Sequence, residues 1–332
     1  MNLSTSPSSY QDGKTGRGGM LLLLTSLVIS YLLAAYYSLW INPEVRFWKE
    51  AYKRKIAWSR KLTAEGRQKL VFIGGSGTAF QIDAGILTRA SIPAVNMGMH
   101  AGMGSRATAA LGLSALAKGD TVIWAFEPDR LTKTPELEPL GYQILLATGV
   151  ILGKGPEQLA LENLHMLDFL AALRPGLDHS AVMLAKVALK HPLYRYKEEF
   201  IRPGGAITTD ELRSIPYSQV HKTIPDSTTL AWISSMSRKL YQLDCNSAYL
   251  MPLTYSPPEN AAAILMENRL FLKQLSAGTS VLSDPMMGVE TNLQSFADTP
   301  MHLRAESMEK RTRDLIPILL LFRKSPKDTP GY

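Results

Sequence analysis

Hydrophobic and polar positions alternate with two different spacings from residue 69 onward, which predicts strands alternating with helices. Short apolar runs rich in β-branched and aromatic residues are typical of buried strands, whereas apolar residues every three or four positions are typical of helices. Strands are predicted within 70–73, 92–104, 120–130, 248–260 and 279–285. Helices are predicted at 105–119, 156–173, 180–194, 228–242, 260–278 and 304–322, with a long loop at 200–226. This rhythm favours βαβ units that build a parallel sheet with helices on both faces.

Before this region, residues 20–41 form an uncharged apolar run that is long enough to cross a bilayer as a helix. Tyr36, Tyr37 and Trp40 cluster near its end, as aromatic residues do at a membrane interface. A buried core helix and a cleaved signal peptide are the alternatives. Core helices are rarely this long without a charge, and no small-residue cleavage site follows the run. We therefore expect an uncleaved membrane anchor, preceded by a disordered polar tail over residues 1–19.

A basic juxtamembrane helix is predicted at 42–66, directly after the apolar run. Phe47, Ala51, Ile56 and Leu62 fall roughly on one of its faces. Two interpretations stay open. The helix is either a solvated connection between the anchor and the domain, or an amphipathic helix that lies on the headgroup surface.

The distribution of charge bears on topology and on partners. Lys14 and Arg17 precede the span, and a larger basic group follows it, namely Arg46, Lys49, Lys53, Arg54, Lys55, Arg60 and Lys61. The positive-inside rule therefore places the domain in the cytoplasm, although the rule weakens for long translocated domains. The net charge is +7, and much of it lies beside the membrane without a stacking-aromatic motif, so nucleic acid is not an expected partner.

The first predicted strand ends in a segment that is typical of a ligand site. Gly74 and Gly75 break the strand, and Ser76 follows them at the turn. Ligands bind at the carboxyl ends of strands in α/β sheets, and glycines let the backbone approach a substrate closely. An ordinary strand-to-helix turn is the alternative interpretation.

Asp298 and His302 lie on one short loop before the last predicted helix. A serine hydroxyl becomes a nucleophile when a histidine takes its proton, and a carboxylate holds that histidine in the right tautomer. Together with Ser76 these residues have the types needed for a Ser-His-Asp triad. The alternative is an aspartate that caps the last helix and a histidine on the surface.

Several other chemistries are disfavoured by the sequence. A single cysteine, Cys245, leaves no intramolecular disulfide and no cysteine-based zinc site. The segment GGSGTAF lacks the third glycine of a dinucleotide fingerprint and the lysine of a phosphate-binding loop, and Thr78 replaces the second glycine of a G-x-S-x-G elbow. We expect no metal or organic cofactor, because no metal-ligand spacing links His165, His179, His191 and His221.

Three segments together resemble the SGNH (GDSL-like) hydrolases, and more closely the membrane-anchored SGNH-like proteins associated with bacterial cell-surface polysaccharides. VFIGGS carries Ser76, PAVNMGMHAGMG carries an asparagine followed by glycines, and DTPMHL carries Asp298 and His302. The resemblance covers most of 67–325, although the middle of that segment matches no motif of the family. It implies a three-layer α/β/α sandwich with a five-stranded parallel sheet ordered 2-1-3-4-5, as in flavodoxin.

The resemblance also implies a function and a location. The chain would be a single-pass bacterial membrane protein with an extracytoplasmic domain. It would act as an O-acyl esterase or O-acyltransferase on an envelope or exported polysaccharide, with Ser76 as nucleophile, His302 as base and Asp298 orienting His302. The partners implied are the membrane, an acylated glycan or acyl donor, and polysaccharide-synthesis proteins.

Two features depart from the family pattern. Three residues separate Asp298 from His302, whereas the family usually has two. The family's third block supplies an asparagine to the oxyanion hole, but the corresponding segment here is AFEPD, with Glu127. A carboxylate opposes a developing oxyanion, so it does not simply replace the amide.

Three alternatives follow for the oxyanion hole. The backbone N–H groups of Ser76 and Gly102 form it alone, with Gly98 as the alternative glycine, or another side chain helps, or catalysis is weak or lost. His100 either lines the pocket or is merely packed beside these glycines. Two other functions remain open. The missing asparagine favours a non-catalytic SGNH-like subunit of a polysaccharide assembly system, and the anchor with its basic helix suggests a lipid esterase.

Overall fold

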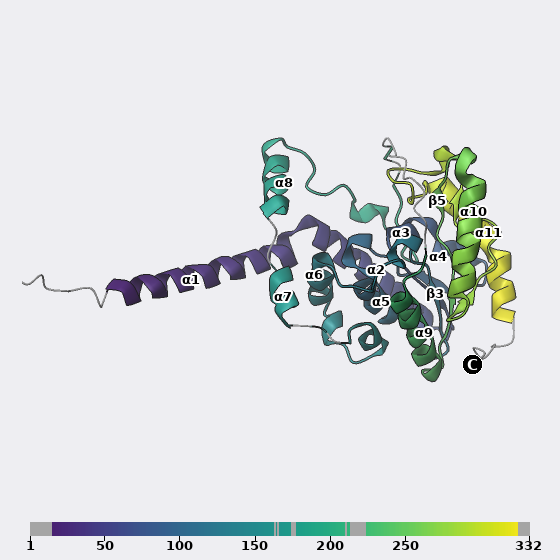
Figure 1. Cartoon of the computed structure of the whole chain (residues 1–332), viewed down its shortest axis with the longest axis horizontal. Helices are drawn as coiled ribbons and strands as arrows, with labels where there is room; N and C mark the ends of the chain where they lie inside the picture. The colour runs from purple at the N-terminus through teal and green to yellow at the C-terminus, as the bar shows by residue number, and fades with distance from the viewer. Residues whose placement is uncertain are drawn as a thin grey trace, which may run out of the picture.

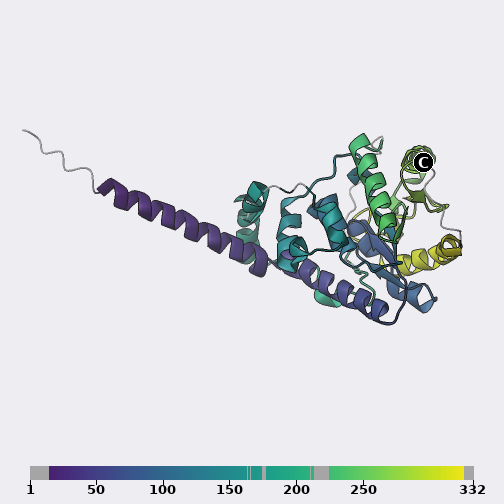
Figure 2. The ribbon, with the colours of Figure 1, turned by 90° about the horizontal axis from the view of Figure 1, so that it is seen from below.

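The chain consists of a long amino-terminal helix followed by an α/β domain (Figure 1). A second view shows the long helix projecting away from the domain (Figure 2). The structure, a computed structural model, describes residues 15–162, 164, 166–173, 177–209, 211–212 and 224–324.

Five parallel strands form the central sheet. They are β1 (Leu70–Ile73), β2 (Ala94–Asn96), β3 (Thr121–Trp124), β4 (Asn246–Tyr249) and β6 (Ser280–Val281). Their order is β2-β1-β3-β4-β6, and each neighbouring pair is parallel. The predicted order 2-1-3-4-5 is confirmed, because β6 is the fifth of these strands along the chain. The segments that follow β1, β2 and β3 therefore meet at one edge of the sheet.

Helices pack on both faces of this sheet. Alternate residues of a strand point to opposite faces, so Val71 and Ile73 belong to one apolar cluster and Leu70 and Phe72 to another. The first cluster includes side chains from α2 (Pro43–Ala64), α5 (Ser105–Leu113), α6 (Pro139–Thr148), α9 (Ser227–Gln242) and α10 (Pro258–Leu275). The second includes α4 (Ala84–Arg89) and α11 (Ala305–Lys324).

The predicted apolar helix at 20–41 is present. α1 (Thr15–Tyr36) continues into a π-helix at Tyr37–Ile41. The stretch Gly18–Ile41 is long and apolar enough to cross a membrane, and most of its side chains are exposed. The helix begins within the tail expected at 1–19, and residues 1–14 lie outside the described residues.

α2 occupies the predicted basic helix but belongs to the folded domain. Val45 and Trp48 on its apolar face are fully buried in the larger cluster. Lys55, which the sequence groups with the basic residues, is buried as well, and its ammonium donates to the carbonyl oxygens of Asn96 and Gly205. The domain thus covers the apolar face of α2, so that face is neither solvated nor available to insert among lipid headgroups.

One predicted helix ends early and another is interrupted, and in both places a side chain donates to a backbone carbonyl. The hydroxyl of Ser114 donates to the carbonyl of Leu111, and α5 ends at Leu113 rather than at residue 119. Arg106 donates to the carbonyl oxygens of Ala160 and Glu162, which a continuous helix over 156–173 would use internally. That segment contains instead a 3₁₀ turn at Pro156–Ala160 and α7 (Met166–Ala172).

The remaining predictions match in part. The helices predicted at 228–242, 260–278 and 304–322 are confirmed as α9, α10 and α11. α8 (Leu177–Ala188) begins and ends earlier than predicted, and α6 was not predicted. The fourth strand is shorter than the predicted stretch, whose later part forms β5 (Thr254–Tyr255), paired with β7 (Val289–Glu290) in a separate sheet.

The long loop predicted at 200–226 is only partly described. A 3₁₀ turn at Glu198–Phe200 leads into it, and Ile201 forms an antiparallel bridge with Ile207. Position 210 and positions 213–223 lie outside the described residues.

Candidate active site

Ser76 is the first residue of α3 (Ser76–Gln81), directly after the carboxyl end of β1. The turn needs glycine at Gly74, because a Cβ there would lie 2.0 Å from the carbonyl oxygen of Ala125. The hydroxyl of Thr78 donates to that same oxygen at 2.5 Å and fixes α3 against the end of β3. Ser76 itself is half-buried, and its hydroxyl makes no hydrogen bond to another described residue.

Asp298 and His302 come together across a tight turn. The backbone N–H of Ala297 donates to the carbonyl of His302, and the N–H of His302 donates to the carbonyl of Thr299. His302 Nδ1 lies 2.8 Å from Asp298 Oδ1, and both side chains are buried. The turn therefore accommodates the wider spacing of the two residues and directs Nδ1 to the carboxylate, as in a triad.

Two further residues hold this carboxylate, and the sequence analysis did not identify them. The Tyr196 hydroxyl donates to Asp298 Oδ2 at 2.9 Å and lies 3.3 Å from His302 Nδ1. A guanidinium nitrogen of Arg195 lies 2.9 Å from the same Oδ2, and the guanidinium covers the ring of Tyr196. No local motif marks these residues, which precede Asp298 by about a hundred positions.

The Asp298–His302 pair packs directly against α3. The ring of Phe80 stacks on the imidazole of His302, with ring centroids 4.0 Å apart and planes 17° from parallel. Gln81 donates to the carbonyl of Met301 at 2.8 Å, which ties the turn to the same helix. Ser76 and Phe80 are four residues apart, so they share a face of α3. The structure thus packs His302 against Phe80, one helical turn after Ser76, without a hydrogen bond between Ser76 and His302.

The electrostatics of the pair suit a neutral base beside a charged carboxylate. Burial lowers the pKa of His302, and the charge of Arg195 adds to this, while Asp298 acts against it. Burial alone would raise the pKa of Asp298, but the hydrogen bond and charge of His302, together with Arg195, bring that pKa below its usual value. At neutral pH His302 is then unprotonated and able to accept a proton.

Glu127 lies beside the amino end of α3. Its Oε1 accepts a hydrogen bond from the backbone N–H of Gly77 at 2.8 Å. Its Oε2 is buried and has no hydrogen-bond partner among the described residues. A Cβ on Gly75 would lie 2.3 Å from that Oε2, so the carboxyl group packs directly on the glycine turn. Burial is the main cause that raises the pKa of Glu127.

The glycines after β2 already use their backbone donors. The N–H of Gly98 donates to Asn96 Oδ1 at 2.8 Å, and the N–H of Gly102 donates to His100 Nδ1 at 2.9 Å. In this conformation neither N–H is free for an oxyanion. The N–H of Ser76, at the first position of α3, has no hydrogen-bond partner among the described residues.

The side chain of His100 packs against an aromatic ring and lies near a carboxylate. Its ring lies edge-on to Trp48, with centroids 5.6 Å apart, and its Nε2 lies 3.6 Å from the carboxylate of Glu44. Burial lowers the pKa of His100 to about 4, and the nearby charge of His302 contributes to this. The amino end of α2, just beyond the apolar helix, therefore borders the candidate site.

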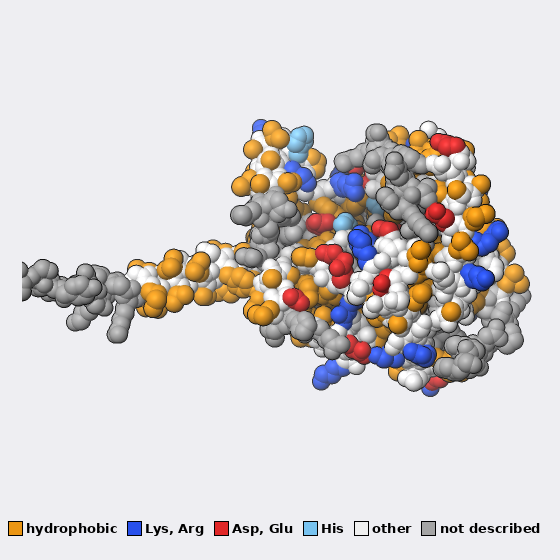
Figure 3. Space-filling model, viewed as in Figure 1, with side chains coloured by type: hydrophobic (Ala, Val, Ile, Leu, Met, Phe, Trp, Pro, Cys, Tyr) orange, Lys and Arg blue, Asp and Glu red, His pale blue; other side chains and the backbone are white. Residues whose placement is uncertain are grey.

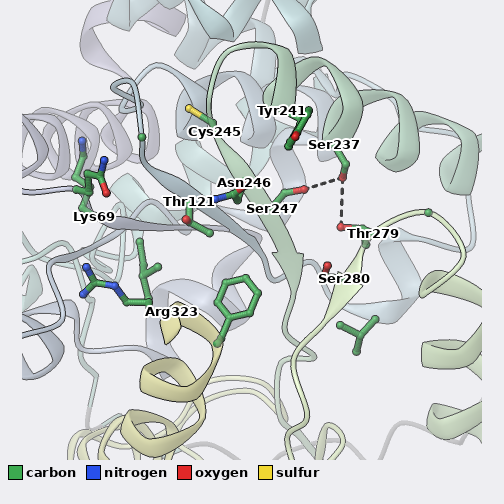
Figure 4. A pocket seen from close by; sticks show the side chains of 16 residues that line it. Lys69, Thr121, Ser237, Tyr241, Cys245, Asn246, Ser247, Thr279, Ser280 and Arg323 are labelled. Carbon is green, nitrogen blue, oxygen red and sulfur yellow. Dashed lines mark hydrogen bonds between the residues drawn. The ribbon is translucent and has the colours of Figure 1, made fainter. Parts of the chain in front are cut away.

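A cavity lies at the other end of the sheet (Figure 4). Its volume is ≈ 510 Å³, and residues at the amino ends of the strands line it, including Thr121, Asn246 and Ser280. Ser237 within it accepts from Ser247 and donates to Thr279. Because Ser76 follows the carboxyl end of β1, this cavity is separate from the candidate site.

Among the described residues no group of histidine, cysteine, aspartate and glutamate side chains could hold a metal ion. His191 is exposed, the side chain of His179 is not described, and His165 and His221 lie outside the described residues. No protein-family model, curated protein or solved structure matches the chain.

Proposed function

We propose that the chain is a membrane-anchored SGNH-like O-acyl esterase or O-acyltransferase that acts on an envelope or exported polysaccharide of a bacterium. The observation that carries this proposal is the buried Asp298–His302 pair packed against the helix that begins with Ser76. The strand order and the helices on both faces fit the three-layer α/β/α sandwich of that family. We place the domain on the extracytoplasmic side, where such glycans are modified.

In the proposed reaction Ser76 attacks an acyl carbonyl while His302 Nε2 accepts the hydroxyl proton. This step requires Ser76 Oγ to come within hydrogen-bond distance of His302 Nε2. Asp298, held by Tyr196 and Arg195, stabilises the imidazolium that forms. The N–H of Ser76 is the available backbone donor for the oxyanion. His302 then returns a proton to the leaving oxygen.

The acyl-enzyme is resolved by one of two acceptors. Water completes an esterase cycle, and a sugar hydroxyl completes a transferase cycle, with His302 removing the acceptor proton in both. The substrate is therefore an acylated glycan or another acyl donor. Polysaccharide-synthesis proteins in the same membrane would bring donor and acceptor to the site.

A non-catalytic SGNH-like subunit is the second candidate, and one observation favours it. Glu127 occupies the position of the oxyanion asparagine, and its carboxyl group already binds the N–H of Gly77. A site that lacks both this amide and a free N–H from Gly98 or Gly102 has few oxyanion donors.

Serine-reactive labelling of the full-length protein separates the two candidates. An enzyme should bind a fluorophosphonate probe and hydrolyse p-nitrophenyl acetate, and both activities should be lost in Ser76→Ala and His302→Ala, because triad residues act as a unit. Asp298→Asn should lower activity by a large factor through the wrong imidazole tautomer. Ser276→Ala, at an exposed serine after α10, is the control and should label normally.

The contrary outcome is also specific. Wild-type protein that neither labels nor turns over any acyl ester, while Ser76→Ala still supports polysaccharide export in cells, would make the non-catalytic subunit the better assignment.

A further inference from the structure

Two helices that the proposed chemistry does not use expose an unusual amount of apolar surface. α7 and α8, together called the α7–α8 arm, present large hydrophobic side chains to the outside, with Leu184 71% and Val187 62% exposed. The other exposed residues of this kind on the arm are Leu167, Leu170 and Val182. Figure 3 shows hydrophobic side chains gathered over α8 and along α1. Soluble domains rarely expose contiguous apolar patches of this kind.

The arm lies beside the apolar helix α1. The hydroxyl of Tyr31, on α1, donates to the backbone carbonyl of Leu170, on α7, at 2.9 Å. Figures 1 and 2 both show α7 and α8 next to the domain end of α1. The arm therefore contacts the candidate membrane span at the end of α1 that is nearest the domain.

The length of the span sets the depth of this contact. A hydrocarbon core about 30 Å thick needs about 20 helical residues. The span Gly18–Ile41 has 24 residues, and the domain covers Ser38 near its end. Tyr31 lies ten positions before Ile41, about 15 Å along the helix axis. The carbonyl of Leu170 is then at hydrocarbon depth, where a tyrosine hydroxyl needs a protein acceptor.

Two charged side chains of the arm, Asp168 and Lys186, have protein partners. The carboxylate of Asp168 lies 3.5 Å from the hydroxyl of Tyr142 on α6. The ammonium of Lys186 donates to the carbonyl of Leu193 at 3.1 Å. Among the described side chains of the arm, the large exposed ones are mainly apolar, which is the composition of a surface that faces lipid.

We propose that the α7–α8 arm inserts into the bilayer that α1 spans and forms a second contact with lipid acyl chains. The inference rests on the depth of the Tyr31–Leu170 contact and on the exposed apolar residues, and it does not depend on the acyl chemistry. The chain that leaves α8 reaches Arg195 and Tyr196 within a few residues. Insertion of the arm would thus hold the residues that support Asp298 close to the membrane surface.

Depth-dependent fluorescence quenching tests this proposal with the full-length protein in phosphatidylcholine nanodiscs. Leu184→Cys and Val187→Cys are each labelled with an environment-sensitive nitrobenzoxadiazole dye, since the native Cys245 is buried. Lipids that carry a nitroxide on the acyl chain should quench both labels. Leu22→Cys, on α1, is the positive control for insertion, and Met266→Cys, 67% exposed on α10, is the matched negative control.

The decisive comparison is between the arm and α10 in samples where the Leu22 label is quenched. Insertion is supported if the labels at 184 and 187 are quenched as strongly as the label at 22 while the label at 266 keeps its fluorescence. Labels on the arm that behave like the label at 266 overturn it. A blue-shifted but unquenched label on the arm also overturns it, because another protein or a second copy would then cover this surface.

Discussion

Glu127 is the residue at which this site differs most from the pattern of the proposed family. Its carboxyl group is buried, its Oε1 is bonded to the N–H of Gly77, and its Oε2 has no hydrogen-bond partner among the described residues. Burial raises its pKa, with a smaller contribution from the charge of Asp129. Protonation would remove the charge that opposes an oxyanion, and deprotonation would leave a buried, half-satisfied carboxylate.

We expect Glu127→Gln to leave esterase activity unchanged or to raise it. The glutamine oxygen can still accept from Gly77, and its amide supplies a donor near the oxyanion without a charge. Activity toward p-nitrophenyl acetate measures the effect. A large loss of activity would show instead that the glutamate itself takes part in the reaction.

The same substitution should change the dependence of stability on pH. Because the pKa of Glu127 is raised in the folded state, the wild-type protein loses stability as the pH rises from the usual glutamate range through that raised pKa. The free energy of unfolding should therefore be higher for Glu127→Gln than for the wild type, and this difference should be larger at about pH 8 than at about pH 4. Urea unfolding at both values checks this, and Glu259→Gln, at an exposed side chain on α10, should show little such trend.

At the residue scale the sequence predicts the site only where its residues adjoin predicted elements. Ser76 follows a clear strand, and Asp298 and His302 share one loop before a clear helix. Arg195 and Tyr196 could not be predicted, because they reach Asp298 from a distant segment with no motif of its own. The hydrogen bond that occupies the N–H of Gly102 depends on the rotamer of His100, which periodicity does not determine.

At the scale of elements, α2 shows what hydrophobic periodicity does and does not predict. The spacing of its apolar residues predicts a helix with one buried face, and that face is buried. It does not predict which element covers the face, and it assigns Lys55 to the solvent side. The end of α5 and the break before α7 likewise involve hydrogen bonds from the side chains of Ser114 and Arg106 to backbone carbonyls. A pattern of apolar positions does not predict such hydrogen bonds.

We expect Lys55→Met to destabilise the domain by about 1–3 kcal/mol, because two buried carbonyl oxygens, those of Asn96 and Gly205, lose their donor. Burial lowers the pKa of Lys55 to about 7, so the wild-type protein gains stability as the pH rises from about 7 toward the usual lysine range. The loss of unfolding free energy in Lys55→Met, relative to the wild type, should therefore be larger at about pH 9 than at about pH 7.

Chemical unfolding of the full-length protein in detergent measures this difference. Lys53→Met is the matched control on the same helix, since Lys53 is exposed and contacts only Glu50 at 3.8 Å. Equal effects of the two substitutions would contradict a structural role for the buried ammonium.

At the scale of the whole molecule, the alternation of strands and helices was enough to predict the parallel sheet and its strand order. The side of the membrane on which the domain lies does not follow from the fold. The basic residues after the span favour the cytoplasm, whereas the proposed glycan substrate requires the outside. A long folded domain can override the charge rule, so we expect it to be extracytoplasmic.

Alkaline phosphatase fused after Tyr332 should therefore be active, and a green fluorescent protein fused at the same position should be dark. The reverse pattern would show that the domain lies in the cytoplasm, where it could not reach an exported polysaccharide. Fusions before Lys14 are the internal control, because they should report the opposite side of the membrane.

The junction between α1 and α2 contains no flexible linker. The N–H of Asn42 donates to the carbonyl of Tyr37, and the carbonyl of Asn42 accepts from Arg46, so backbone hydrogen bonds continue through the bend. Ser38 is buried, and the side chain of Asn42 caps α2. If α1 spans a bilayer as proposed, the height of Ser76 above that bilayer is therefore fixed by the chain itself. If the protein modifies a polymer, the acyl groups within reach are those that pass at that height, and distance from the membrane, more than sugar identity, selects where the polymer is modified.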